Sequence, residues 1–599
     1  MKFLKKLVKR YFSSFAFFYS YLGHKIFIAF ALSIAVSLMD GLGLAMFFPL
    51  LQVVSGDDLS TSSQELGNLS FLIDGIEGLG IPLNLVSILL VMVFFFILKG
   101  IAIYLSSIYQ VILKMSFMSK LRLDLINSLN KITFKKFVLS DVGRIQNTLT
   151  GEVNSIAGAF TSYFGTFQQG LMLAVYIGIA FFVDSQFALL VFIGGMCTHF
   201  LYNIIYKYTE QSSNKLTKFT NRFQGEVIQH VNNFKYLRAT ARIHDYSEKL
   251  EESINNIETT RRRIGYWASI SSAAREPLLV IIIAIVIFVQ LRYFEGKMGA
   301  ILISLFYFYR ALTALVALQL NWNSFLQNIG SMNNMLDFQK HLANNQHKDG
   351  KITISNFHDS IQFKNVDFFY DQTQILKNVN ITIRKNYTYA FVGESGSGKT
   401  TLIHLLVNLL PEDNGQILID GLPMRQLNAA SYQKLIGYIS QDAVIFNDTI
   451  YNNVTFWAAP TPENIERFWK SVEQASLLKF IQELPENEQT ELGNNGINLS
   501  GGQKQRISIA RELYKDVELL IMDEATSALD SETENEIRES LEALHGQLTI
   551  ISIAHRLSTI RHADFIYLLD KGEVIAHGSF EELKEKSDYF AKMTALQGL

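Results

Sequence analysis

Residues 393–401 combine glycines, hydroxyl side chains and a lysine in a spacing that binds phosphate groups. They follow the apolar stretch TYAFV and fit the pattern G-x-x-x-x-G-K-[ST]. Glycines let backbone N–H groups curl around phosphate oxygens, and the start of the following helix adds partial positive charge. Lys399 can reach the β- and γ-phosphates of a nucleotide, and the Thr400 hydroxyl can hold Mg²⁺. The predicted set is Gly393, Glu394, Ser395, Gly396, Ser397, Gly398, Lys399, Thr400 and Thr401. The alternative is a glycine-rich turn without a ligand.

Two adjacent carboxylates end another apolar stretch, VELLIMDE at 517–524. At the end of a strand, Asp523 is suited to hold Mg²⁺, directly or through water. Glu524 is suited to polarise the water that attacks a γ-phosphate. Solvated strand ends often carry acidic residues, so the pair is informative only together with the phosphate loop. Together they predict hydrolysis of a nucleoside triphosphate.

The stretch NLSGGQKQR at 498–506 predicts a second helix start that binds phosphate. Its first residues leave backbone N–H groups free where the helix dipole favours an anion. With this stretch, residues 352–599 resemble the nucleotide-binding domain of the ATP-binding cassette (ABC) family, whose signature LSGGQ is matched without change. In that family the signature of one domain closes over the phosphate loop of another. The resemblance assigns this role to Ser500, Gly501, Gly502 and Gln503, with Asp530 at the seam between the two domains.

Further residues match family positions in order, and their roles are those that the resemblance implies. Tyr370 corresponds to the aromatic residue that stacks on adenine, Gln441 to the glutamine that senses Mg²⁺, and His555 to the switch histidine at the γ-phosphate. Each also has an ordinary structural alternative, such as strand packing, loop polarity or a satisfied strand end, but their order favours the family. The implied catalytic residues are Glu524, His555 and Gln441; the implied Mg²⁺ ligands are Thr400, Gln441 and Asp523; the cofactors are ATP and Mg²⁺.

One stretch departs from the family pattern. Many exporters of the family read close to E-R-G before the signature, where this sequence has GNNG at 493–496. Asn494 and Asn495 lack the charges, which puts the usual contact at this point in doubt. The catalytic positions are not affected.

The first 330 residues carry six apolar stretches long enough to cross a bilayer, which takes about 20 apolar residues. The stretches are 26–54, 83–113, 156–183, 186–207, 264–292 and 298–325. The connection 55–82 carries five carboxylates and no lysine or arginine, whereas 114–150 and 207–263 are rich in both basic residues. By the positive-inside rule, both chain ends and the nucleotide-binding half are cytoplasmic.

The predicted fold class is a multi-domain membrane protein. An all-α domain with six membrane helices, like that of type I ABC exporters (type IV transporter fold), precedes an α/β P-loop NTPase domain. The predicted parts are an interfacial helix with an aromatic face at 1–25, the membrane domain at 26–330, a linker at 331–351 and the nucleotide-binding domain at 352–599. The first helix could instead pack on protein, and 65–82 could form a short outer helix or a simple loop. The net charge of −2 gives no reason to expect nucleic acid as a partner.

Charged side chains interrupt the membrane stretches, most of them near mid-depth: Arg275, Glu276, Arg310, Asp40 and, nearer the cytoplasm, Lys99. Each costs at least about 2.5–3.5 kcal/mol there, so it persists only against polar protein groups or in a water-filled cavity. In one interpretation, Arg275, Arg310 and Lys99 line a central cavity that accepts an anionic group. In the other, Asp40 and Glu276 neutralise the arginines as internal ion pairs.

One set of motifs and six spans predict that two copies assemble into a homodimer in the bacterial cytoplasmic membrane, with a heterodimer as the alternative. The stretches 148–160, 232–241 and 436–456 are similar to those of bacterial flippases for lipid-linked oligosaccharides. The resemblance implies ATP-driven flipping or export of such a lipid, or of another amphipathic lipid, by alternating access. A general exporter of amphipathic drugs is the alternative, ahead of a peptide exporter or an ATP-gated regulator or channel.

Overall fold

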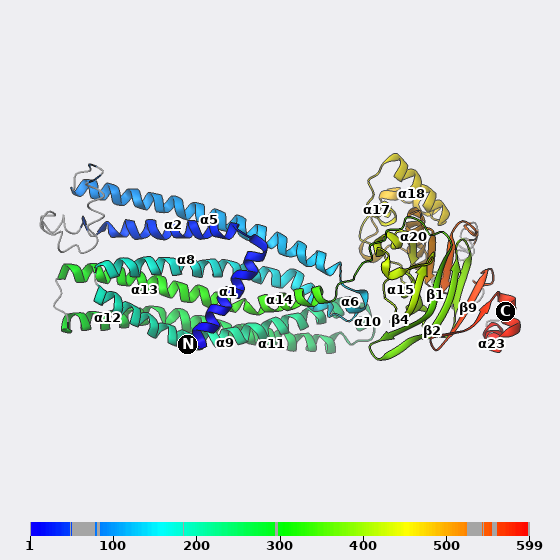
Figure 1. The fold of residues 1–599 in the computed structure, drawn as a ribbon, viewed down its shortest axis with the longest axis horizontal. Helices are drawn as coiled ribbons and strands as arrows, with labels where there is room; N and C mark the ends of the chain where they lie inside the picture. The colour runs from blue at the N-terminus through cyan, green and yellow to red at the C-terminus, as the bar shows by residue number, and fades with distance from the viewer. Residues whose placement is uncertain are drawn as a thin grey trace. The chain divides into compact units, whose positions relative to one another are not determined.

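The structure is a computed structural model that describes residues 2–47, 49–50, 84–183, 185–293, 298–523, 544–553 and 560–596, with isolated residues between some of these ranges. The chain forms two compact units (Figure 1). The first comprises Met1–Ile132 and Leu139–Gln346, and the second comprises Thr133–Val138 and His347–Leu599. Glu524, Asp530, His555 and almost all of 55–82 lie outside the described residues.

The first unit is built of helices. In chain order they are α1 (Lys2–Leu22), α2 (Lys25–Ala45), α5 (Leu85–Leu129), α7 (Val142–Asn147), the π-helix η2 (Thr148–Glu152), α8 (Val153–Val183), α9 (Ser185–Asn232), α10 (Phe234–Ala239), α11 (Ile243–Ala273), α12 (Arg275–Tyr293), α13 (Met298–Gln327) and α14 (Ile329–Asn344). The residues predicted as a linker are thus largely helical, because Met332, Met335, Phe338 and Leu342 form one buried face of α14.

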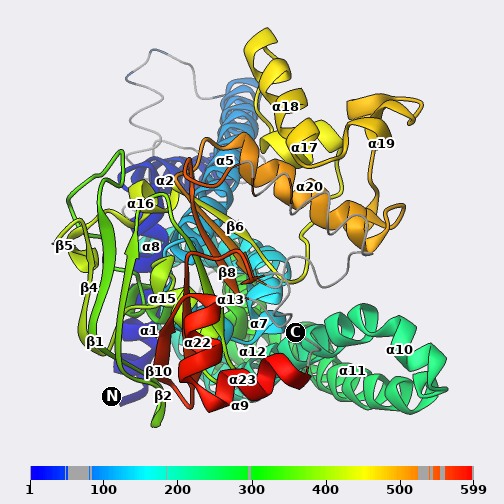
Figure 2. The ribbon, with the colours of Figure 1, turned by 90° about the vertical axis from the view of Figure 1, so that its right-hand side faces the viewer.

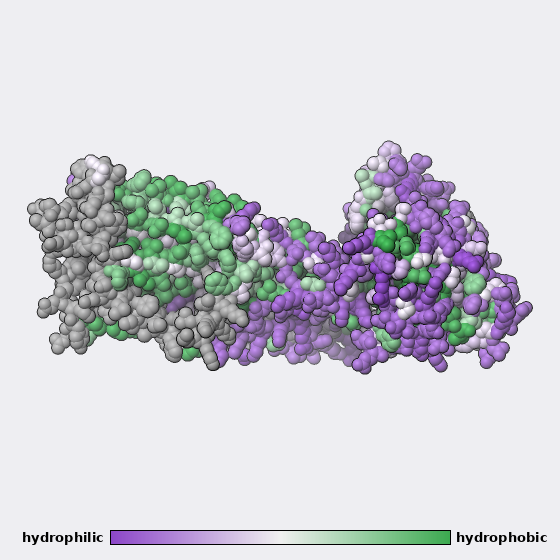
Figure 3. Space-filling view, viewed as in Figure 1, coloured by the Kyte–Doolittle hydropathy of each residue, from purple (hydrophilic) through white to green (hydrophobic). Residues whose placement is uncertain are grey.

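Four helical segments of the described chain are long and apolar enough to cross a bilayer: Lys25–Ala45, Leu85–Leu129, Val142–Phe181 and Ile243–Val289. Helices α9 and α13 run through the other two predicted spans. On α5 the large apolar side chains Val86, Leu90, Phe94, Ile97, Ile101 and Tyr104 are exposed. Figure 3 shows this part of the unit as a continuous hydrophobic surface. Such a surface is stable in lipid rather than in water, as expected for a membrane domain.

Helix α1 packs its aromatic face on protein. Phe18 is fully buried, and its ring centroid lies 5.3 Å from that of Phe117, 5.4 Å from that of Phe160 and 5.3 Å from that of Tyr163. Aromatic rings at these separations add to the apolar area that they bury. The predicted aromatic face is therefore part of the core formed with α5 and α8.

The segment Arg275–Pro277 is a helix junction rather than the interior of a helix. Helix α11 ends at Ala273 and α12 begins at Arg275, so Pro277 falls in the first turn of α12. A first-turn proline costs little, because the N–H that it lacks has no partner within a helix at that position. The junction explains how a proline is accommodated inside an apolar stretch.

The second unit contains two sheets, and its first element is α6 (Phe134–Val138). One sheet has the order β2-β1-β4-β5, from β1 (Ser360–Tyr370), β2 (Thr373–Arg384), β4 (Asn414–Ile419) and β5 (Leu422–Pro423). The other has the order β10-β9-β3-β8-β7-β6, from β3 (Thr388–Val392), β6 (Ile436–Ile439), β7 (Leu519–Asp523), β8 (Thr549–Ile553), β9 (Phe565–Asp570) and β10 (Glu573–Gly578). Its β6, β7, β8, β3 and β9 pair in parallel.

Helices complete the second unit: α15 (Lys399–Leu406), α16 (Ala429–Gln433), α17 (Ile450–Thr455), α18 (Pro462–Gln474), α19 (Leu478–Gln482), α20 (Gly501–Tyr514), α22 (Phe580–Lys586) and α23 (Asp588–Leu596). Apolar side chains of both sheets and of α15 share one core, in which Phe363, Phe391, Leu402 and Ile551 are buried. Figure 2 shows α17, α18 and α19 gathered beside α20, and these helices share a second core.

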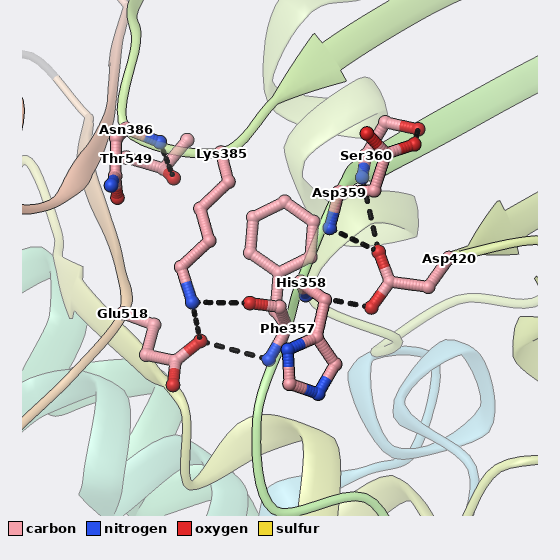
Figure 4. Close-up of polar contacts among 9 residues, drawn as sticks. All are labelled: Phe357, His358, Asp359, Ser360, Lys385, Asn386, Asp420, Glu518 and Thr549. Carbon is pink, nitrogen blue, oxygen red and sulfur yellow. Dashed lines mark hydrogen bonds and ion pairs between the residues drawn. The ribbon is translucent and has the colours of Figure 1, made fainter.

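A polar clamp fixes the start of β1 (Figure 4). The Asp420 carboxylate accepts hydrogen bonds from the backbone N–H groups of His358, Asp359 and Ser360 at 2.7, 2.7 and 3.0 Å. Beside it, the Glu518 carboxylate accepts from the Phe357 N–H at 2.8 Å and from the Lys385 ammonium at 3.0 Å. Both acids thus hold the segment that leads into β1 within the second unit.

Candidate functional site

The order of the parallel sheet brings the predicted phosphate-handling motifs to one edge. Ile553 of β8 is the register partner of both Phe391 on β3 and Asp523 on β7. The loop that begins at Gly393 follows β3, which is separated from β7 by β8 alone. Gln441 follows β6, which is the neighbour of β7 on its other side. Ligands of open parallel sheets bind at the carboxyl ends of the strands. Glu524 directly follows β7 in the sequence, and His555 is the second residue after β8; both lie outside the described residues.

The glycines of the phosphate loop adopt backbone conformations that other residues rarely adopt. Gly393 has φ 154° and Gly398 has φ 102°. A Cβ atom at Gly393 would lie 2.2 Å from the Leu569 carbonyl oxygen, and one at Gly398 would lie 2.7 Å from a methyl carbon of Leu376. The loop can therefore close tightly between β3 and α15 only with glycine at both positions.

The remaining loop residues fit a triphosphate. Lys399, which is only 5% exposed, donates from Nζ to the carbonyl oxygens of Gly393 at 2.8 Å and of Glu394 at 2.9 Å. Its charge is thus held inside the loop. The Ser397 hydroxyl is buried without a hydrogen-bond partner among the described residues. A buried polar atom of this kind is satisfied when a ligand oxygen is bound.

The residues proposed for Mg²⁺ fit an ion that is bound together with a nucleotide. Among the described residues, no group of three or more His, Cys, Asp or Glu side chains could hold a metal alone. Mg²⁺ usually takes one or two protein oxygens together with phosphate oxygens and water. Thr400 and Gln441 are exposed, whereas Asp523 is buried at the end of β7 and accepts a hydrogen bond from the Tyr438 hydroxyl at 3.3 Å.

The signature stretch opens α20 with a capping box. The Ser500 hydroxyl accepts from the Gln503 N–H at 3.2 Å, and the Gln503 side chain accepts from the Ser500 N–H at 2.8 Å. Ser500 and Gly501 are exposed. The helix thus begins at the predicted residues, with its first residue and its cap exposed to solvent.

The GNNG stretch before the signature forms a tight turn. Asn495 has φ 57°, in the left-handed region that asparagine tolerates better than most residues. The Lys504 ammonium donates to the Asn495 carbonyl oxygen at 2.7 Å and so ties the turn to α20. Asn495 therefore has a conformational role in the stretch that departs from the family pattern.

Two features of this half were missed by the sequence analysis. Arg511 of α20 is buried and donates to the Val444 and Asn453 carbonyl oxygens at 2.7 and 2.6 Å, which fixes the segment after Gln441. Burial lowers the pKa of this guanidinium from its usual range. In addition, α6 packs beside Tyr370, through Lys135.

One ion pair forms among the described membrane charges, and it involves Lys99 rather than an arginine. The Lys99 ammonium lies 2.5 Å from Asp40 Oδ1, so Asp40 neutralises a lysine rather than an arginine. Within the described part of the chain, neither Arg310 nor Glu276 has an ion-pair partner, and Arg310 lies over the Phe306 ring at 5.9 Å from its centroid. The Arg275 side chain is not among those described. Among the side chains that the structure describes, none forms the predicted ion pair with Arg310.

Comparisons with known proteins agree with both halves. Residues 26–315 match the family described as "ABC transporter transmembrane region", and residues 376–527 match "ABC transporter". The chain is 30% identical over 520 residues to an ATP-dependent lipid A-core flippase of Syntrophus aciditrophicus, which covers 85% of each chain. It is 28% identical over 497 residues to the heterocyst differentiation ATP-binding protein HepA of Nostoc sp., covering 82% of this chain and 81% of that one. The fold matches a bacterial Atm1-family ABC exporter with ATP bound, with TM-score 0.79, 22% identity and 97% and 99% of the two chains covered.

Proposed function

The chain belongs to the ABC transporter family as an exporter half with fused membrane and ATPase domains, and on this premise we propose that its homodimer flips an anionic glycolipid across a bacterial cytoplasmic membrane. Lipid-linked oligosaccharides and lipid A-type glycolipids share this chemistry: acyl or prenyl chains, phosphate groups and saccharide. ATP with Mg²⁺ binds between the phosphate loop of one copy and the Ser500 helix start of the other. Hydrolysis, through Glu524 and His555, releases the two domains.

The dimer is supported by apolar surfaces that one copy leaves uncovered. In the first unit, Val231, Phe234 and Tyr236 at and beside α10 are exposed. In the second unit, the segment that Arg511 fixes, from Val444 to Asn453, and the residues just after it carry exposed apolar side chains. These are Val444, Phe446, Phe456 and Trp457. Clusters of exposed apolar side chains are typical of interaction surfaces. We expect a second copy to cover both of them.

An anionic substrate is supported by Arg310, and this observation carries the proposal. Its guanidinium lies in α13, inside a predicted span, without an ion-pair partner in the described chain. A charge at that depth persists when it faces a polar cavity or a ligand of opposite sign. A phosphate group of the substrate supplies that sign. Several relatives of the chain are ATP-dependent lipid A-core flippases, which supports the same class of lipid.

The test is transport in vesicles that contain the purified protein. We expect ATP-dependent flipping of a diphosphate-linked glycolipid, and its loss in Glu524→Gln. Arg310→Gln should lower flipping about tenfold while basal ATP hydrolysis persists. The exposed cytoplasmic Arg262→Gln serves as the matched control. Drug-stimulated ATP hydrolysis together with drug transport, and no movement of glycolipid, would instead identify a general exporter of amphipathic molecules.

A further inference from the structure

The helix α6 reaches the strand that ends in Tyr370. The Lys135 ammonium donates a hydrogen bond to the Phe369 carbonyl oxygen at 2.9 Å. The same Nζ lies 5.4 Å from the ring centroid of Phe368 and 5.9 Å from that of Tyr370. These two rings are perpendicular, at 87° with centroids 5.0 Å apart. One cation thus contacts the backbone and both rings at the end of β1.

No carboxylate is paired with Lys135 among the residues that the structure describes. Its charge is compensated by the Phe369 carbonyl and by the faces of the two rings. A partly buried ammonium within about 6 Å of a ring centroid is attracted to the ring quadrupole by roughly 0.5–2 kcal/mol. Lys135 and Tyr370 are both half-buried, so this contact is stronger than one in open solvent and part of the tyrosine ring stays accessible.

We propose that Lys135 is a positioning residue that sets the affinity of the site for the adenine base through Tyr370. This role rests on the proposed function, in which Tyr370 stacks on adenine. The hydrogen bond to Phe369 and the ring contacts hold Tyr370 in one orientation before the nucleotide arrives, so binding loses less side-chain entropy. The ammonium also draws ring electron density to one side, which favours stacking of an electron-rich purine on the accessible part.

A second contact of α6 makes it possible to distinguish the proposed effect of Lys135 on Tyr370 from the simple attachment of the helix. The Phe134 ring lies 5.3 Å from the His404 ring at 70°, and His404 belongs to α15, the helix that begins at Lys399. Phe134 therefore anchors α6 through α15, an element that does not contain Tyr370. A Phe134→Ala variant loosens the helix, whereas Lys135→Met removes the charge and keeps most of the side-chain length.

The experiment measures binding of ADP and of pyrophosphate, which lacks the base, to the purified full-length protein by calorimetry. Lys135→Met should weaken ADP binding about three- to tenfold and leave pyrophosphate binding unchanged. Lys135→Arg should restore ADP binding to within about twofold, because a guanidinium also binds aromatic faces. The exposed Lys131→Met, four residues earlier, should match the wild type. In ATP hydrolysis the effect of Lys135→Met should fall on KM and not on kcat.

A double-mutant cycle decides whether the effect passes through Tyr370. In a Tyr370→Leu background, Lys135→Met should cause no further loss of ADP affinity. The proposal would be overturned if the two substitutions lowered ADP affinity additively, or if Lys135→Met weakened pyrophosphate binding as much as ADP binding. It would also be overturned if Phe134→Ala weakened ADP binding to the same extent and left pyrophosphate binding unchanged. If the wild-type protein bound neither ADP nor ATP, the proposed ATP-driven function itself would be wrong. If the protein bound ADP normally but did not flip glycolipid, the proposed substrate would be wrong, whereas the proposed role of Lys135 would still stand.

Discussion

Lys99 of α5 and Asp40 of α2 form an ion pair inside the membrane unit, with 2.5 Å between Nζ and Oδ1. Asp40 is almost fully buried and also accepts a hydrogen bond from the Tyr176 hydroxyl of α8. Three helices that are distant in the sequence therefore meet at one carboxylate. In an apolar span this arrangement satisfies two charges that would otherwise be costly.

Removing one partner of this pair should destabilise the protein more than removing both. Asp40→Asn or Lys99→Met leaves one buried charge unpaired and should cost about 3 kcal/mol, whereas the double variant should recover part of this loss. Thermal unfolding in lipid nanodiscs measures the effect, with Lys114→Met on the same helix as control. Losses that simply add in the double variant would show that the two side chains do not interact.

The signature serine should have a role beyond capping its helix. Ser500 and Ser579 both form capping boxes, at the starts of α20 and α22. Replacing either by alanine should therefore cost about 1 kcal/mol of stability. Only Ser500→Ala should also reduce ATP hydrolysis, by at least about tenfold, because in the proposed dimer its hydroxyl and the adjacent N–H groups bind phosphate of the nucleotide held by the other copy. Equal rates of ATP hydrolysis in the two variants would contradict the assignment of the signature.

Acidic pH should destabilise the second unit through His404. Burial lowers the pKa of His404 below its ordinary value, and its Nδ1 has no hydrogen-bond partner in the described chain. Below about pH 6.5 the unfolded chain binds a proton at this histidine and the folded chain does not, so stability is lost as the pH falls. The drop in unfolding temperature between pH 8 and pH 5.5 should be smaller in His404→Gln than in the wild type or in His562→Gln. Identical drops in all three proteins would exclude His404 as the cause.

Substitutions of Asp420, in the clamp at the start of β1, should lower the stability of the protein in proportion to the hydrogen bonds that they remove. Asp420→Ala removes the acceptor of three backbone N–H groups and should cost about 2–3 kcal/mol. Asp420→Asn keeps one carbonyl oxygen for Asp359 and Ser360 and should cost about half as much. Chemical denaturation followed by circular dichroism measures both. If the alanine variant were as stable as the wild type, the clamp would contribute nothing to folding.

Much of the candidate site could be predicted because its motifs are contiguous. The phosphate loop and the signature each consist of adjacent residues whose local conformation follows from glycine and a capping serine, and Asp523 ends β7 as its apolar stretch predicts. The family, the two-part fold and the ATPase were confirmed. The long apolar stretches likewise predicted helices, since about 20 apolar residues suffice for a span.

What the sequence could not supply were pairings between distant elements. Asp40 could have neutralised any of three cations by charge alone, and only the packing of α2 on α5 selects Lys99. The polar stretch after the last span became helix α14 because its few apolar side chains find a common buried face. Likewise, Lys135 lies far from Tyr370 in the chain, and no local pattern predicts that they meet. Local conformation is encoded by neighbouring residues, whereas the choice of partner is decided by packing in three dimensions.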